Sequence, residues 1–169
     1  MTAPIHSIWL MPANDDALLL ASLVSGLSQR FGMPLFTPHL TIAGDTDRPA
    51  TTLAAAIREA AGRVAAFQEA VAAIETSEAF FRSFYARFAI AAPLATLKQR
   101  LDGQSSEPFM PHVSLLYGPV EAGPKTAAAT EVAASLVGRP IRFDRLCVVT
   151  SGQDVPIADW RIVETVALG

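Results

Sequence analysis

Cysteine is nearly absent from this sequence, with Cys147 as the only one among 169 residues. No disulfide can therefore form within the chain. Cys147 lies in the apolar run 146–149, which is typical of a buried structural thiol, and no neighbouring residue marks it as a nucleophile. Thiol chemistry is therefore not expected.

Long hydrophobic runs are also missing. The longest uncharged stretches, such as 17–29, are shorter than the ~20 residues that a membrane helix needs. The N-terminus has no basic segment followed by an apolar stretch and a cleavage site, as a secretory signal would have. We therefore expect a soluble, cytoplasmic monomer that makes no membrane contact.

An excess of positive charge is the third feature that the sequence lacks. The 13 Lys and Arg residues are outnumbered by 16 Asp and Glu residues, which gives a net charge of -3. Proteins that bind long nucleic acids usually carry a basic stripe, so such a partner is not expected, whereas a small anionic substrate remains possible. The 51% hydrophobic content excludes an intrinsically disordered chain, and the length suits one domain over 1–169.

Hydrophobic periodicity predicts strands and helices interspersed along the whole chain. Strands are expected at 5–11, 39–43, 68–78, 84–91, 112–117, 141–150 and 161–167. Helices are expected at 14–31, 49–64, 93–103 and 124–137, with Asn14 as the N-cap of the first. Neighbouring strand pairs and short loops favour an α+β fold over a doubly wound parallel sheet. The prediction is one two-lobed unit, in which the second half of the chain resembles the first.

A repeated hexapeptide is the most informative feature that is present. Residues 36–41 read Phe-Thr-Pro-His-Leu-Thr, and residues 109–114 read Phe-Met-Pro-His-Val-Ser. The two copies place His39 and His112 in the same frame, 73 positions apart (112 − 39). Since the chain has only three histidines, two of them in matched frames indicate a site built by duplication. The third, His6, has no such twin and is interpreted as structural.

Strand geometry explains why this spacing matters. Side chains at i and i+2 share a face of a strand, so His39 points with Thr41, and His112 points with Ser114. Two such strands related by a pseudo-two-fold axis would put both imidazoles and both hydroxyls in one cleft. A zinc site is disfavoured because neither motif is paired with a third ligand, and a serine hydrolase because no Gly-x-Ser-x-Gly elbow is present.

The paired motifs resemble the two His-x-Thr/Ser signatures of the 2H phosphoesterase superfamily. Segments 6–12, 111–118 and 160–166 are similar to its cyclic phosphodiesterase (CPDase)-like branch, known from plants and yeast, so the resemblance spans nearly the whole chain. It implies a bilobal α+β fold with two pseudo-symmetric sheet-and-helix lobes around a central, water-filled cleft. It also implies an enzyme that needs no metal or cofactor.

The same resemblance implies a substrate class and three further site residues. The substrates would be ADP-ribose 1″,2″-cyclic phosphate, or nucleoside 2′,3′-cyclic phosphates that are opened to 2′-phosphates. Tyr117 matches an active-site tyrosine, and Trp9 and Phe81 match aromatic residues that bind the nucleotide. Tyr117 lies at an odd offset from His112, so the strand must bend or end near Gly118 to turn this side chain toward the cleft. Phe80, Phe81 and Phe84 can also be interpreted as core residues, because this segment aligns in more than one frame.

The residue types fit the chemistry of opening a cyclic phosphate. One imidazole can deprotonate water while the other, as imidazolium, protonates the leaving oxygen, since the histidine pKa lies near ~6.5. The Thr41 and Ser114 hydroxyls could donate to the non-bridging oxygens. The resemblance alone favours His112 as base and His39 as acid. Two alternatives stay open: a 2′-5′ RNA ligase-like phosphodiesterase acting on RNA ends, and a nucleotide-binding module without activity.

Metal independence is the first testable prediction. Hydrolysis of a 2′,3′-cyclic nucleotide by the purified protein should persist after exhaustive treatment with EDTA, because the two motifs offer only two nitrogen ligands where a zinc site typically takes three or four protein ligands. A loss of turnover that added zinc or magnesium restores would contradict it.

Overall fold

The computed structural model describes residues 2–169. Seven strands are present in this range: β1 Ile5–Pro12, β2 Leu40–Thr46, β3 Phe67–Thr76, β4 Phe84–Phe88, β5 His112–Leu116, β6 Pro140–Ser151 and β7 Arg161–Ala167. They are connected by α-helices α1 Asn14–Phe31, α2 Ala50–Ala61, α3 Ala92–Asp102 and α4 Ala122–Leu136, and by short 3₁₀ turns η1 Phe80–Arg82 and η2 Ile157–Asp159. Within residues 2–169, no helix is both long and apolar enough to cross a bilayer.

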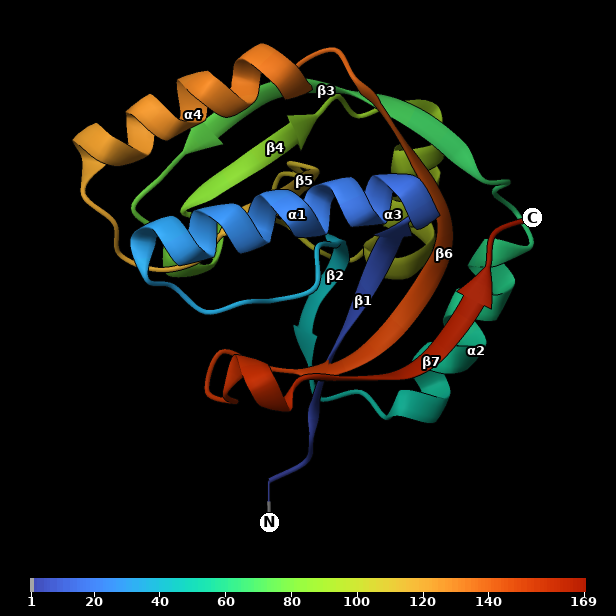
Figure 1. Ribbon diagram of the computed structural model, residues 1–169. Coiled ribbons are helices and arrows are strands. Elements are labelled where there is room, and N and C mark those ends of the chain that lie inside the picture. The colour runs from blue at the N-terminus through green and yellow to red at the C-terminus, as the bar shows by residue number, and fades with distance from the viewer. Residues whose placement is uncertain (1) are drawn as a thin grey trace.

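The strands form one antiparallel sheet in the order β1-β2-β5-β4-β3-β6-β7. Because β1 also pairs with β6, the first six strands of this order close into a ring. β7 pairs with β6 but is not part of this ring. Figure 1 shows α4 lying along β3 and β4 on one side of the molecule and α2 beside β7 on the other. The ring joins two lobes, one built on β1, β2, β6 and β7 and the other on β3, β4 and β5.

The two lobes meet at joints of unequal extent. Between β3 and β6 the register includes four residue pairs, whereas β2 and β5 share the single pair Leu40 and Val113. Lys98 of α3 supports this sparse joint from behind, because its Nζ donates to Ile42 O at 2.9 Å and to Asp102 Oδ2 at 2.6 Å. The same ammonium lies 5.0 Å from the centre of the Phe109 ring, on the segment that leads into β5.

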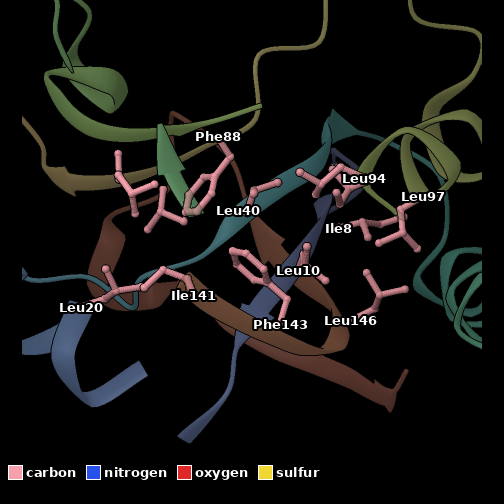
Figure 2. Packing of buried hydrophobic residues seen from close by; sticks show 14 of the residues in the cluster. Ile8, Leu10, Leu20, Leu40, Phe88, Leu94, Leu97, Ile141, Phe143 and Leu146 are labelled. Atoms are coloured by element: carbon pink, nitrogen blue, oxygen red, sulfur yellow. The ribbon is translucent and has the colours of Figure 1, made fainter. Parts of the chain in front are cut away.

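Alternation along the strands separates a core face from a cavity face. In β1, Ile8 and Leu10 are fully buried in the main apolar cluster, while Ser7 and Trp9 line a cavity. Figure 2 shows Ile8, Leu10 and Leu40 packing with helix residues such as Leu94. This one cluster also contains strand and helix residues from the second half of the chain, such as Phe88, Leu97 and Phe143. The core therefore fixes both lobes against each other and leaves the opposite strand faces free for a site.

The predicted fold class, α+β with two lobes around a cleft, is confirmed, and all of the predicted helices and strands are present. Two local predictions are wrong. The N-cap of α1 is Ala13, with no side-chain hydrogen bond, and Asn14 is already helical. The second strand begins at Leu40, one residue later than predicted, and His39 precedes it.

Truncation at the sparse joint should destabilise the protein. Leu40→Ala removes a fully buried side chain at the only residue pair between β2 and β5, so we expect the free energy of unfolding to fall by about 2–5 kcal/mol in urea denaturation. Leu35→Ala, at a position that is 64% exposed, is the control and should change it by less than about 0.5 kcal/mol. Equal stability of the two variants would contradict the importance of this joint.

Candidate active site

A cavity of about 570 Å³ opens on the face of the sheet opposite the core. The structure brings all seven of the sequence-predicted site residues to its wall: Trp9, His39, Thr41, Phe81, His112, Ser114 and Tyr117. They come from β1, from the beginnings of β2 and β5, and from the turns around η1 and after β5. Residues from both lobes therefore share one site.

The single pair between β2 and β5 relates the two motifs to each other. Leu40 lies opposite Val113 in an antiparallel register, so the histidine of each motif falls beside the hydroxyl residue of the other. His39 is thus level with Ser114, and Thr41 with His112. A local two-fold axis passes through the pair, as a duplicated site requires.

Both histidines are held in the same way. His39 Nδ1 lies 2.7 Å from Thr37 O, and His112 Nδ1 lies 2.9 Å from Met110 O. Because a carbonyl oxygen can only accept, each Nδ1 carries the hydrogen and each Nε2 is left for the cavity. A neutral ring then accepts a proton at Nε2, and a protonated ring donates one there.

The surroundings of the two rings differ. His39 is 8% exposed and stacks on Trp9, with ring centres 3.5 Å apart and planes 7° apart. Burial lowers the pKa of His39 to about 4; the bond to Thr37 opposes this shift, and the charge of His112 adds to it. Burial also lowers the pKa of His112, opposed by the bond to Met110 and reinforced by the positive charge of Arg82. In the free protein both rings are therefore mainly neutral at pH 7.

The two hydroxyl residues are not equivalent either. Ser114 is 6% exposed, and its Oγ donates to Phe81 O at 2.9 Å. A serine hydroxyl has one proton, so Ser114 can donate to a substrate only by turning away from Phe81. Thr41 lies on the cavity wall, level with His112 in the register of β2 and β5. The sequence motif alone does not reveal this difference.

The turn that carries Phe81 is fastened from behind by a buried lysine. Lys125 of α4 is 5% exposed, and its Nζ donates to Ser77 O at 2.8 Å and to Ser83 Oγ at 3.2 Å. On the other side Gly118 N donates to Phe80 O at 2.9 Å. Together with Ser114, these bonds hold η1 at the cavity, and with it Arg82, which lines the wall.

Tyr117 reaches the cavity because β5 ends at Leu116, as its odd offset required. Gly118 follows with a φ of +106°, which an L side chain rarely adopts, and a Cβ there would lie 2.3 Å from Met33 Sδ. The Tyr117 ring stacks on Phe36, with centres 3.7 Å apart. Burial raises the pKa of Tyr117, so its hydroxyl stays protonated and can donate.

The structure shows which phenylalanines around η1 face the cavity and which belong to the core. Phe81 lines the cavity, Phe84 is fully buried in the core, and Phe80 is 43% exposed although it also reaches the cavity wall. Trp160, which lies within the C-terminal segment of the resemblance, was not predicted as a site residue. Its ring centre is 5.8 Å from that of Phe81 and 6.0 Å from that of Trp9, so it connects aromatic residues of the two lobes.

Sequence reasoning also missed polar residues of the wall, among them Ser7, Asp45, Arg82, Glu107 and Ser151. None of these residues lies in the repeated hexapeptide, and the closed ring of strands brings them together. His6 lies outside the cavity wall, is buried, and bonds through Nδ1 to Arg48 O at 3.0 Å. Across residues 2–169, no group of three or more His, Cys, Asp or Glu side chains could hold a metal ion.

Among known proteins, the chain is similar to the cyclic phosphodiesterase of Arabidopsis thaliana, with 26% identity over 172 residues that cover 97% of this chain and 93% of the relative. No protein-family model matches the chain. Its fold is similar to that of apo LigT from E. coli, with 15% identity, a TM-score of 0.59 and 99% of each chain covered. LigT complexed with 3′-AMP and a protein described as a phosphoesterase give the same TM-score, at 14% and 15% identity.

The buried state of His39 predicts a pH-dependent stability. Its pKa is about 4 in the folded protein against an ordinary value of 6.5, so the unfolded chain binds the proton more tightly. The contribution of this ring is complete above pH 6.5 and is lost as the pH falls toward 4, up to about 3 kcal/mol. His39→Asn should remove this contribution.

The measurement is the free energy of unfolding of both proteins between pH 4 and 7.5. The difference between wild type and His39→Asn isolates the ring from the carboxylates, which titrate in both proteins. We expect that difference to fall as the pH decreases. A difference that stays constant over this range would show that His39 is not buried in its neutral form.

Proposed function

The chain belongs to the 2H phosphoesterase superfamily, in its cyclic phosphodiesterase-like branch, and we propose that it hydrolyses a small cyclic nucleotide phosphate without a metal. The observation that carries the proposal is the pair of imidazoles whose Nε2 atoms are both left for one cavity, across a local two-fold axis. Hydrolysis of a cyclic phosphodiester needs a base on one side of phosphorus and an acid on the other. The two motifs supply one ring for each task.

In the proposed reaction, Nε2 of one neutral histidine takes a proton from water as the water oxygen bonds to phosphorus. The bond from phosphorus to one ester oxygen of the ring breaks, and the second histidine, as imidazolium, gives its Nε2 proton to that oxygen. The product is a phosphate monoester with a free vicinal hydroxyl. Each histidine Nδ1–H stays bonded to its carbonyl throughout, so that the ring keeps its orientation.

The roles of His112 as base and His39 as acid follow the resemblance, and one contact of each ring agrees with them. Burial and the positive charge of Arg82 lower the pKa of His112 and so disfavour an imidazolium there, whereas the face of Trp9 stabilises a cation at His39. Burial opposes a charge on His39 in the free protein. A bound phosphate brings a negative charge next to that ring, which raises its pKa and offsets the cost of burial.

The remaining site residues would act on the non-bridging oxygens and on the nucleoside. Thr41 and Tyr117 are hydroxyl donors on the cavity wall, and Ser114 joins them once it turns from Phe81. Trp9, Phe81 and Trp160 offer aromatic surface to the nucleoside. We expect the substrate to be ADP-ribose 1″,2″-cyclic phosphate or a nucleoside 2′,3′-cyclic phosphate, the latter opened to the 2′-phosphate.

Two observations bear on the alternatives. The Arabidopsis relative is named a cyclic phosphodiesterase, and the LigT structures include complexes with 3′-AMP, ATP and NADP+, all of which are small nucleotides. A role on RNA ends, as in 2′-5′ RNA ligase-like proteins, is less favoured by the net charge of -3. A nucleotide-binding module without activity would need neither the matched Nδ1 bonds nor the depressed pKa values of the two rings.

Turnover of adenosine 2′,3′-cyclic phosphate by single variants tests the proposal. His39→Ala and His112→Ala should each lower kcat by at least ~10²-fold, the lower limit for one acid–base group. The double variant should be little worse than either single variant, because the two rings act as one unit. Thr41→Ala and Ser114→Ala should cost less, since each removes one donor among several. Chromatography should identify the 2′-phosphate as product.

His6→Asn is the matched control, because it replaces a buried histidine that lies outside the cavity wall. Circular dichroism establishes that each variant is folded. Near-normal turnover in either His39→Ala or His112→Ala would exclude the two-histidine mechanism. Formation of the 3′-phosphate alone would leave that mechanism intact and would contradict the proposed branch of the superfamily.

A further inference from the structure

A chain of polar side chains crosses the cavity wall in the first lobe, away from both motifs. Ser7 of β1 and Ser151 of β6 are each 3% exposed, and their Oγ atoms lie 2.8 Å apart. Ser151 Oγ also lies 3.4 Å from Asp45 Oδ1. All three residues line the cavity that contains the histidines, and none of them belongs to the repeated hexapeptide.

The direction of the hydrogen bonds along this chain follows from counting protons. Ser151 gives its single hydroxyl proton to the Asp45 carboxylate, whose oxygen accepts. The 2.8 Å contact between the two serines then has Ser7 as donor and Ser151 as acceptor. Both serine hydroxyl protons are thus used in hydrogen bonds among these three side chains. What remains for the cavity is a set of lone pairs on Ser7 Oγ and on the Asp45 carboxylate.

Three side chains that can only accept hydrogen bonds select the ligand group that they meet. A phosphate would find no donor here and would be repelled by Asp45, whereas an N–H or O–H group would be matched. In the other lobe the wall contains Arg82, the sole Lys or Arg among the described residues of the cavity wall, together with the acidic Glu107. The single cationic side chain and the three acceptor residues thus come from different lobes, which favours one orientation of a bound nucleotide.

We propose that Ser7, Ser151 and Asp45 form a subsite that receives a hydrogen-bond donor of the nucleoside, either an exocyclic amino group or a sugar hydroxyl. Occupation of this subsite orients the cyclic phosphate toward His39 and His112. The inference rests on the proposed function, since it assigns the orientation of the same substrate. It adds a specificity-determining group that acts on substrate binding and takes no part in the proton transfers.

Asp45→Asn is the decisive variant, because Asp45 is exposed and the change replaces one acceptor oxygen by a donor amide. We expect KM for adenosine 2′,3′-cyclic phosphate to rise about tenfold or more, as for loss of a hydrogen bond to a charged group, with kcat within about twofold of wild type. Asp47→Asn, two residues further along the chain, just after the end of β2 and outside the cavity wall, is the matched control and should leave both constants unchanged.

Two analogues distinguish the sources of the donor. Purine riboside 2′,3′-cyclic phosphate lacks the amino group, and 5′-deoxyadenosine 2′,3′-cyclic phosphate lacks the free hydroxyl of the sugar. For the analogue that lacks the donor bound in the subsite, KM with the wild-type protein should be higher than for adenosine 2′,3′-cyclic phosphate. Asp45→Asn should then cause no further increase in KM for that analogue. An unchanged KM for all three substrates in Asp45→Asn would overturn the proposal, and so would a fall in kcat without a rise in KM.

A binding measurement separates this inference from the proposed function. Adenosine 2′-phosphate is titrated into wild type, Asp45→Asn, Ser151→Ala and Asp47→Asn by calorimetry. If wild type turned over none of the cyclic phosphates, the proposed function would be wrong, and the subsite would then be judged by Kd alone. We expect weaker binding by Asp45→Asn and Ser151→Ala than by Asp47→Asn, and equal Kd values for all four proteins would overturn the subsite.

Discussion

One residue pair determines the geometry of the site. Leu40 and Val113 provide the only ladder pair between β2 and β5, and the two motifs extend from it in opposite directions. The separation of the two histidines therefore depends on how firmly this joint is held. The sheet alone holds this joint weakly, because a single residue pair contributes few backbone hydrogen bonds. Lys98 compensates by bonding Ile42 O next to the first motif while lying over Phe109, which leads into the second. A helix on the far side of the sheet thus helps the shared core to hold the two motifs in place.

The symmetry of the backbone is not matched by the symmetry of the side chains. Both rings use the same bond from Nδ1 to a carbonyl two residues earlier, which orients them equally. Their neighbours then make them unequal, with an indole face against His39 and a guanidinium near His112. The repeat supplies two equivalent imidazoles, and the proposed reaction assigns one of them the role of base and the other the role of acid. The same division extends to the cavity wall, where one lobe offers acceptors and the other a cation.

The sequence allowed much of this architecture to be predicted, for identifiable reasons. Alternation of apolar residues marks strands and their faces, and the repeated hexapeptide marks the two strand beginnings that form the site. Residues that come together only because the strands close into a ring could not be predicted in the same way. Asp45 and Ser151 are 106 positions apart, and Lys125 reaches Ser77 across 48, so no local pattern relates them. Trp160 was missed for a similar reason, because an aromatic residue before a strand is ordinarily interpreted as core.

The stack of His39 on Trp9 also gives the site an optical property. An imidazolium ring in contact with an indole quenches its fluorescence by accepting an excited electron, whereas a neutral imidazole quenches it far less. With planes 7° apart and centres separated by 3.5 Å, Trp9 is in the closest possible contact with the ring whose charge changes during the proposed reaction. The emission of this one indole is therefore coupled to the ionisation of its neighbour. The protein carries a built-in reporter of protonation, which can be observed without any label while a ligand enters the cavity.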